Sequence, residues 1–245
     1  MTKDINTRLN RFMETTGIDL QPVGVFDVTD PAPFAPFAEP AQCIFTHFAE
    51  WKMGKSTLIS ADNTTAYDCP GAGYWLCGVQ GMPRDAVIGY LFGQEGLKAS
   101  ADTMTRWMET HPPYTPENKA VVIAPMDTPA AATHMDRLKT VTFFIRPDQL
   151  ALLVTGAEHL NGASDVFPVS AIYGSGCGQM LSHFDTFDAP KALLGGTDIA
   201  VRKHLPPDIL AFTVTLPMLR QLLNLDGASF LHKTFWTELK AHRTV

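Results

Sequence analysis

The sequence predicts a single α+β domain, 1–245, with a mixed or antiparallel sheet and packed helices. Apolar runs of strand length, such as VVIA and VTFFI, stand between segments whose apolar residues recur at helical spacing. The 245 residues are 45% apolar and 18% charged, which is typical of one chain with a packed core and not of a disordered one. A strand–loop–strand–helix rhythm that occurs twice supports the same class.

The N-terminal half is expected to be mainly helical. Residues 5–16 carry the apolar face of an amphipathic helix, and PVGVF at 22–26 is typical of a short buried strand. Four prolines exclude regular structure from DPAPFAPFAEP at 30–40, whose two Phe predict that the loop packs onto the protein. The other elements expected here are a helix over 42–52, a strand over 57–60, and helices over 70–79 and 96–110.

Strands dominate the C-terminal half. The expected elements are strands over 121–124 and 141–145, a helix over 147–157, strands over 166–173 and 192–194, a short helix over 198–204, a strand over 209–214 and a helix over 217–224. When residues 121–154 are aligned with residues 191–224, the two segments have the same order of strand, loop, strand and helix. The two segments could be a pseudo-repeat or two β-α units that are merely similar, and both interpretations remain open.

Composition and charge limit which binding partners and which cellular compartment the sequence predicts. The net charge is −6 and no long run of Lys or Arg occurs, so nucleic acid is not expected to bind. The charged N-terminus lacks the apolar region of a secretory signal, and the apolar runs are too short to span a membrane. We therefore expect a soluble cytoplasmic protein whose cysteines are thiols or metal ligands. A protein partner or a homo-oligomer remains open.

The first candidate site is the stretch CPGAG, which begins at Cys69. Pro70 suits a first helical position, so Cys69 is expected at a helix start, where unpaired N–H groups and the helix dipole favour the thiolate. Gly71 and Gly73 would let the backbone approach a ligand closely. A site for an anion or a metal cluster and plain close helix packing both fit. Cys77 is expected to pack as a small hydrophobe.

The second candidate site is GSGCGQ, in which Cys177 lies between Gly176 and Gly178. Such a loop can present several N–H groups together, as an anion-binding nest does. The residues do not follow the full G-x-S-x-G pattern, so hydrolase chemistry is not indicated. The structural alternative is a plain turn at the end of a strand.

Two further motifs carry polar candidates. In GGTDIAVRKHLPPD, Thr197 or Asp198 can cap a short helix, and Arg202 could either pair with Asp198 or neutralise an anion held by the glycines. Cys43 and His47 lie four residues apart on a predicted helix, where they could bind a metal together or pack among aromatic neighbours. EGLK, at 95–98, offers Glu95 and Lys98 as polar candidates.

Together these segments resemble the domain of unknown function 169 family, the uncharacterised ArCR group. The resembling stretches keep their order over residues 17–215: PVGV, CPGAGYWLCG, EGLKAS, VVIAPM, FFIRPDQLALLV, YGSGCGQ and GGTDIAVRKHLPPDILAFTV. The family has no established activity, so the resemblance implies a class and no mechanism. It also implies a grouping, because the family's characteristic cysteines correspond to Cys43, Cys69 and Cys177. Three such thiols could hold an iron–sulfur cluster or a thiophilic metal, with His47 as a further group.

Three functions are compatible with these residues. The first is a binding protein of a redox or cofactor pathway, with a metal, iron–sulfur cluster or anionic cofactor held by the three cysteines, the glycines and Arg202. The second is an enzyme with Cys177 or Cys69 as thiolate nucleophile. The third is a small-molecule or partner binding protein with purely structural cysteines. Where the sulfurs lie in the folded protein separates the first from the third.

Overall fold

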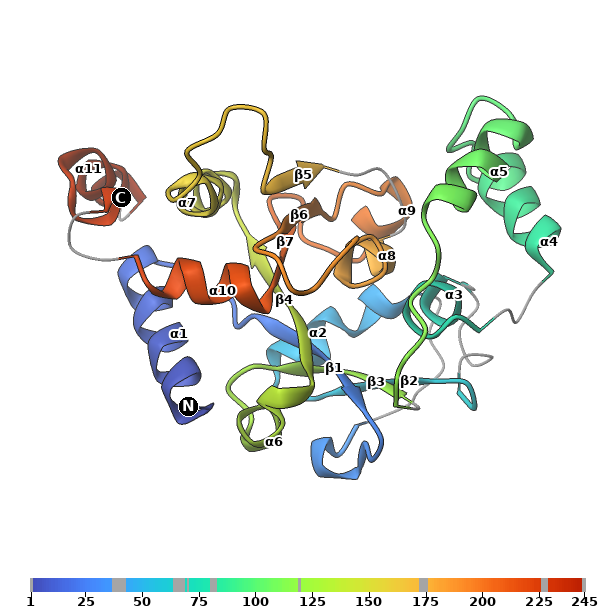
Figure 1. Ribbon diagram of the computed structural model, residues 1–245, viewed down its shortest axis with the longest axis horizontal. Coiled ribbons are helices and arrows are strands. Elements are labelled where there is room, and N and C mark those ends of the chain that lie inside the picture. The colour runs from blue at the N-terminus through green and yellow to red at the C-terminus, as the bar shows by residue number, and fades with distance from the viewer. Residues whose placement is uncertain are drawn as a thin grey trace.

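The described part of the computed structural model comprises residues 2–36, 43–63, 69, 71–79, 83–118, 120–171, 176–225 and 229–243. Its seven strands form one sheet in the order β2-β3-β1-β4-β7-β6-β5 (Figure 1). Neighbouring strands are antiparallel except β5 and β6, which are parallel. This confirms the predicted α+β class with a mixed sheet. The strands are β1 (Val23–Val28), β2 (Thr57–Ser60), β3 (Ala120–Pro125), β4 (Leu138–Ile145), β5 (Val169–Ala171), β6 (Ala192–Gly195) and β7 (Leu210–Thr215).

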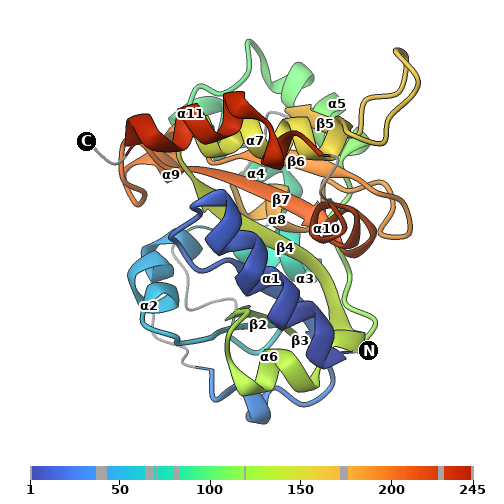
Figure 2. The same cartoon turned by 90° about the vertical axis from the view of Figure 1, so that its left-hand side faces the viewer.

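Helices cover both faces of the sheet (Figures 1 and 2). On the first face, which we call the α1 face, lie α1 (Thr2–Thr16), α6 (Pro129–Thr133), α7 (Pro147–Glu158), α10 (Leu216–Leu223) and α11 (Thr234–Arg243). On the opposite α3 face lie α2 (Phe48–Lys52), α3 (Gly71–Cys77), α4 (Arg84–Gly89), α5 (Ala101–Thr110), α8 (Gly176–Met180) and α9 (Ile199–Arg202). Strand alternation produces the two cores, since Phe143 and Ile145 belong to the α1 face and Phe144 to the α3 face.

The repeated rhythm has a clear counterpart at the centre of the sheet. β4 and β7 pair antiparallel, with Phe143 opposite Phe212, and each strand runs directly into a helix, α7 or α10, on the α1 face. Outside this pair the two halves differ. β1 separates β3 from β4, whereas β6 pairs directly with β7. The similarity of 121–154 and 191–224 therefore extends to one strand–helix unit in each half and not to their strand neighbours.

Several short elements were not predicted. Among them are α4, the π-helix η4 (Tyr90–Gln94) that follows it, α6 and α11. The expected helix 42–52 is a 3-10 turn, η2 (Ile44–His47), followed by α2. The expected loop around Cys177 is a helix, α8, from Gly176 onward, and positions 172–175 lie outside the described residues. In the proline-rich loop, Ala32–Phe34 forms one 3-10 turn, and Phe34 packs against Phe26 with ring centroids 5.1 Å apart, as its aromatic character predicted.

Membrane-spanning helices were searched for in the described ranges. No helix there is both long enough and apolar enough to cross a bilayer.

A buried carboxylate anchors the segment that leads from α5 to β3. Asp27 is 1% exposed and accepts hydrogen bonds from Tyr114 Oη, from the Glu117 amide at 2.8 Å and from the Asn118 amide at 3.0 Å. The Tyr114 amide also donates to the carbonyl of Trp75 in α3, at 3.1 Å. Asp27 therefore holds the return from α5 against β1, and the Tyr114 amide holds it against α3.

Replacing this carboxylate should destabilise the fold. Asp27→Ala leaves two backbone amides and a phenol without their acceptor, so we expect the free energy of unfolding to fall by about 2–4 kcal/mol. Urea denaturation followed by circular dichroism measures the change. The exposed Asp165→Ala is the matched control and should change the value by less than about 0.5 kcal/mol. Equal effects of the two variants would contradict the anchoring role.

Candidate functional site

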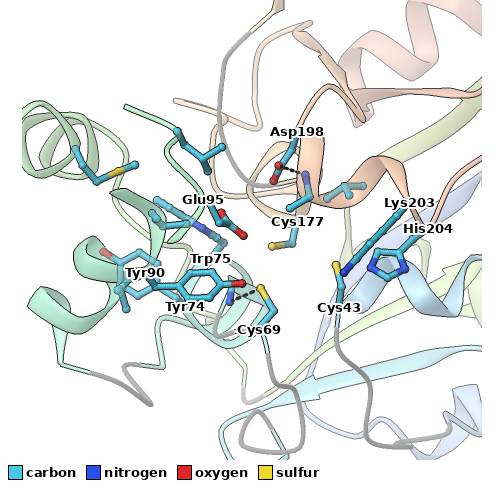
Figure 3. Close-up of a pocket in the computed structure, with 18 of the residues that line it drawn as sticks. Cys43, Cys69, Tyr74, Trp75, Tyr90, Glu95, Cys177, Asp198, Lys203 and His204 are labelled. Atoms are coloured by element: carbon cyan, nitrogen blue, oxygen red, sulfur yellow. Dashed lines mark hydrogen bonds between the residues drawn. The ribbon is translucent and has the colours of Figure 1, made fainter. Parts of the chain in front are cut away.

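A cavity of about 340 Å³ lies on the α3 face, and three of the four cysteines line it (Figure 3). Cys43, Cys69 and Cys177 come from segments far apart in the sequence. Cys77 is not among the described lining residues. It is buried in the core of the α3 face and donates its S–H to the carbonyl of Ile59, at 3.2 Å. The structure thus brings together the three cysteines that the family resemblance groups, and it leaves Cys77 outside them.

Two of these sulfurs flank Gly71. A β-carbon on Gly71 would lie 3.2 Å from Sγ of Cys177 and 3.3 Å from Sγ of Cys69. The two sulfurs are therefore separated by no more than the sum of those distances, about 6.5 Å. Figure 3 shows Cys43, Cys69 and Cys177 turned toward one common space. Glycine at position 71 keeps the room between the sulfurs of Cys69 and Cys177 open.

Contacts across the sheet hold Cys177 in place. The carbonyl of Met180, at the end of α8, accepts a hydrogen bond from the buried Thr140 hydroxyl of β4, at 2.6 Å. The side chain of Gln179 accepts the Gly196 amide at 3.1 Å, which joins α8 to the loop after β6. Asp198 caps α9 by accepting the Ala200 amide at 2.9 Å, and it also accepts the Gly176 amide at the start of α8. α8 is therefore fixed at both ends.

The glycines proposed to cradle a cofactor have different environments. Gly71 and Gly176 line the cavity, whereas Gly73 and Gly178 are not among the described lining residues. A β-carbon on Gly176 would lie 2.8 Å from the Phe45 ring, and one on Gly178 would lie 2.5 Å from the His183 ring. These two glycines thus permit close packing of α8.

Arg202 does not face the cavity as a counter-charge. Its guanidinium donates to four backbone carbonyls, those of Gly196, Pro206, Pro207 and Ile209. The prediction that Arg202 neutralises an anion was based on features nearby in the sequence, namely its spacing from Asp198 and the adjacent glycines. The four carbonyls that accept its hydrogen bonds come together only in the folded loop, so the sequence did not reveal them. Its neighbours Lys203 and His204 line the cavity instead.

The polar groups on the wall include two carboxylates. Burial raises the pKa of Asp198, which has two amide donors, and also raises the pKa of Glu95. Tyr90 donates its hydroxyl to Glu95, and burial together with that carboxylate raises the pKa of Tyr90 to about 12. Lys203 is the one ammonium among the described lining residues. The wall is thus richer in acidic than in basic groups.

Burial also determines the protonation state of two thiols on the cavity wall. It raises the pKa of Cys43 to about 12 and raises that of Cys69 as well. The Gly71 amide does donate to Sγ of Cys69, at 3.4 Å, but desolvation of the thiolate outweighs that bond. The expectation that the helix start favours the Cys69 thiolate was therefore wrong. Both groups are protonated thiols at neutral pH.

Some wall residues escaped the sequence analysis. Tyr90, which was not predicted, belongs to the π-helix η4, a type of helix often found at functional sites. Tyr74 and Trp75 from α3 and Met104 and Trp107 from α5 complete much of the apolar wall. The EGLK motif had indicated Glu95. Lys98 instead lies with its ammonium 5.5 Å from the ring centroid of Trp107, and His47 is buried and is not among the described lining residues.

The structure was also searched for groups of three or more His, Cys, Asp or Glu side chains that could hold one metal ion. Within the residues it describes, none was found. The sulfurs share a cavity without forming the compact shell of a single ion.

Behind the wall lies a buried histidine. His183 is 6% exposed, and its ring packs edge-to-face against Trp75 and Trp107, with centroids 5.2 and 5.7 Å away. Neither ring nitrogen has a hydrogen-bond partner among the described residues. Burial, with a smaller effect of His111, lowers the pKa of His183 from 6.5 to about 3. The ring is therefore neutral and acts as packing for the two tryptophans.

This histidine predicts an acid-sensitive fold. The unfolded chain protonates His183 near pH 6.5 and the folded chain only near pH 3, so its contribution to stability is present above pH 6.5 and is lost as the pH falls toward 3. The loss is up to about 1.4 kcal/mol per pH unit. Relative to wild type, His183→Leu should flatten this part of the pH dependence of the free energy of unfolding. The exposed His242→Leu should leave it unchanged, and parallel curves for wild type and His183→Leu would refute the assignment.

Comparison with known proteins places the chain in a family. No curated protein and no solved structure matches it. The family model for the domain of unknown function 169, described as uncharacterised ArCR, matches residues 11–224. That span includes all three cysteines of the cavity, the Gly71 contact and the loop of Asp198 and His204. The chain belongs to the domain of unknown function 169 family.

Proposed function

We propose that this protein binds an iron–sulfur cluster through Cys43, Cys69 and Cys177 and serves in a redox or cofactor pathway of the cytoplasm. The observation that carries the proposal is the convergence of three thiols, from three separate segments, on the wall of one cavity. Thiolates are the ligands that select iron–sulfur clusters and soft metals. None of the four cysteines forms a disulfide in the described structure, as cluster ligands require before loading.

The geometry favours a cluster over a single ion. One ion needs its ligands in a compact shell, and the described side chains form no such group. A cluster instead distributes its thiolates over several irons, so the sulfurs can stand farther apart. A cavity of about 340 Å³ also has room for more than one ion.

The charges on the wall weigh against an anionic organic cofactor. Glu95 and Asp198 line the cavity, and the guanidinium of Arg202 is bound to backbone carbonyls. The raised pKa of Cys69 likewise gives no support to a thiolate nucleophile at that position, because such a residue needs a lowered pKa or an adjacent base. Iron would displace one proton from each ligating thiol, so loading releases protons.

Anaerobic loading tests the proposal. Full-length protein incubated with ferrous iron and sulfide should become brown, with matching iron and acid-labile sulfide contents and a broad visible absorbance. Cys43→Ser, Cys69→Ser and Cys177→Ser should each weaken iron binding by at least about tenfold, because even outer-shell partners of metal ligands contribute that much.

Cys77→Ser is the matched control, since Cys77 is buried outside the cavity and serine keeps its hydrogen bond to Ile59. It should load like the wild type. A colourless, iron-free wild type, or equal loss in all four variants, would refute the proposal.

A second variant tests the space between the sulfurs. Gly71→Ala places a methyl group 3.2 and 3.3 Å from the sulfurs of Cys177 and Cys69, so cluster content should fall toward that of the cysteine variants. Gly89→Ala, in α4, is its control, because a β-carbon there meets nothing within 4 Å. Iron and sulfide analysis after loading distinguishes them. Full loading of Gly71→Ala in a folded protein would contradict the proposed position of the cluster.

A further inference from the structure

Two thiols of the cavity wall lie on either side of Gly71 in α3. A β-carbon at that position would lie 3.2 Å from Sγ of Cys177 and 3.3 Å from Sγ of Cys69, so the two sulfurs are at most about 6.5 Å apart. Glycine places no side chain between them, and Figure 3 shows both thiols turned toward the same space. Whether two such thiols can join depends on how far their sulfurs must move.

The movement required is of the size that side-chain rotation provides. In a disulfide the two sulfurs are about 2.05 Å apart, so the separation of Cys69 and Cys177 must fall from at most about 6.5 Å to that value. A change of χ1 from one staggered rotamer to another moves a cysteine sulfur by roughly 3 Å, and both residues can contribute. Rotation of the two side chains thus covers the distance.

The other two cysteines are less well placed for this bond. Cys77 is buried in the core of the α3 face, where its S–H donates to the carbonyl of Ile59. Cys43 shares the cavity wall, but its sulfur is farther from the β-carbon position of Gly71 than the other two sulfurs are. The geometry therefore favours the pair of Cys69 and Cys177.

The two thiols differ in their access to an oxidant. Cys69 is half-buried on the cavity wall, whereas Cys177 is 5% exposed and lies in the first turn of α8. A small oxidant that enters the cavity therefore meets Cys69 first. Cys177 is then the thiol on the far side of Gly71 that can complete a bond to it.

We propose that Cys69 and Cys177 are a redox modification site, at which hydrogen peroxide converts the two thiols into a reversible disulfide. Cys69 gives up its proton, its sulfur attacks one peroxide oxygen, and the O–O bond breaks, which leaves a sulfenic acid and one water. The sulfur of Cys177 then attacks the sulfur of Cys69, so that the S–S bond forms, the S–O bond breaks and a second water leaves. The sulfur pair loses two electrons, which the two peroxide oxygens gain.

The disulfide has one consequence for the proposed function. It would consume two of the three thiols assigned to the cluster, so the oxidised protein should lose its uptake of iron and sulfide. A small dithiol should restore both free thiols by thiol–disulfide exchange, and with them the uptake. This consequence rests on the proposed function, whereas the disulfide itself does not.

Peptide mapping tests the disulfide. Metal-free full-length protein is treated with excess hydrogen peroxide, because the raised pKa of Cys69 leaves little reactive thiolate at neutral pH. Remaining thiols are alkylated after denaturation, and the protein is digested without reduction for mass spectrometry. One linked pair of peptides should contain Cys69 and Cys177, with Cys43 and Cys77 alkylated. The matched control, Cys77→Ser, should form the same link, and Cys177→Ser should leave Cys69 unlinked.

Several results would overturn the proposal. They are a link that contains Cys43, a link between two copies of the chain, and wild-type protein in which Cys69 and Cys177 are not linked after the treatment. Loading with iron and sulfide before and after oxidation separates this proposal from the preceding one. A Cys69–Cys177 link in protein that takes up no iron when reduced would support the disulfide and refute the cluster. Iron uptake by reduced protein that forms no link would do the reverse.

Discussion

The close approach of α3 and α8 at Gly71 is the contact on which the site depends. Cys69 stands just before α3, and Cys177 lies in the first turn of α8. Their sulfurs can approach each other because position 71 has no side chain between them. The sheet supports this approach, because the Thr140 hydroxyl of β4 donates a hydrogen bond to the carbonyl of Met180 at the end of α8. Cys43 then needs only to enter from the turn η2, whose residue Phe45 packs against Gly176.

The sheet and its longer helices were predictable because their signals are local. β3, β4 and β7 are buried on both faces, so each appears in the sequence as a run of apolar residues interrupted mainly by threonine, and the prolines at 147 and 217 mark the first turns of α7 and α10. α8 was missed because a segment with two glycines has a low helix propensity. Packing on Phe45, which is distant in the sequence, and on the nearby His183 makes it helical.

The site was predicted in part, and the errors have one physical origin. The three cysteines could be grouped through the family resemblance. His47 was paired with Cys43 on the assumption of 3.6 residues per turn. In the structure Cys43 is an extended residue at the start of a 3-10 turn, where side chains three apart align and those four apart do not. Arg202 was expected to neutralise an anion, whereas His204, for which no role was predicted, lines the cavity. The reason is that the carbonyls that engage Arg202 come together only when residues 196–209 fold back on themselves.

Polar groups of the scaffold and polar groups of the cavity wall differ in the partners that they have. Asp27 and Arg202 are held by several hydrogen bonds each, and both serve the scaffold. The cavity wall instead holds two cysteines that burial keeps protonated and an imidazole nitrogen without a partner. A fold optimised only for stability would fill such a space with apolar side chains. A ligand that binds the folded chain at these thiols would stabilise it, and by more the higher its affinity. The cavity wall is thus the part of the α3 face that a bound ligand would stabilise.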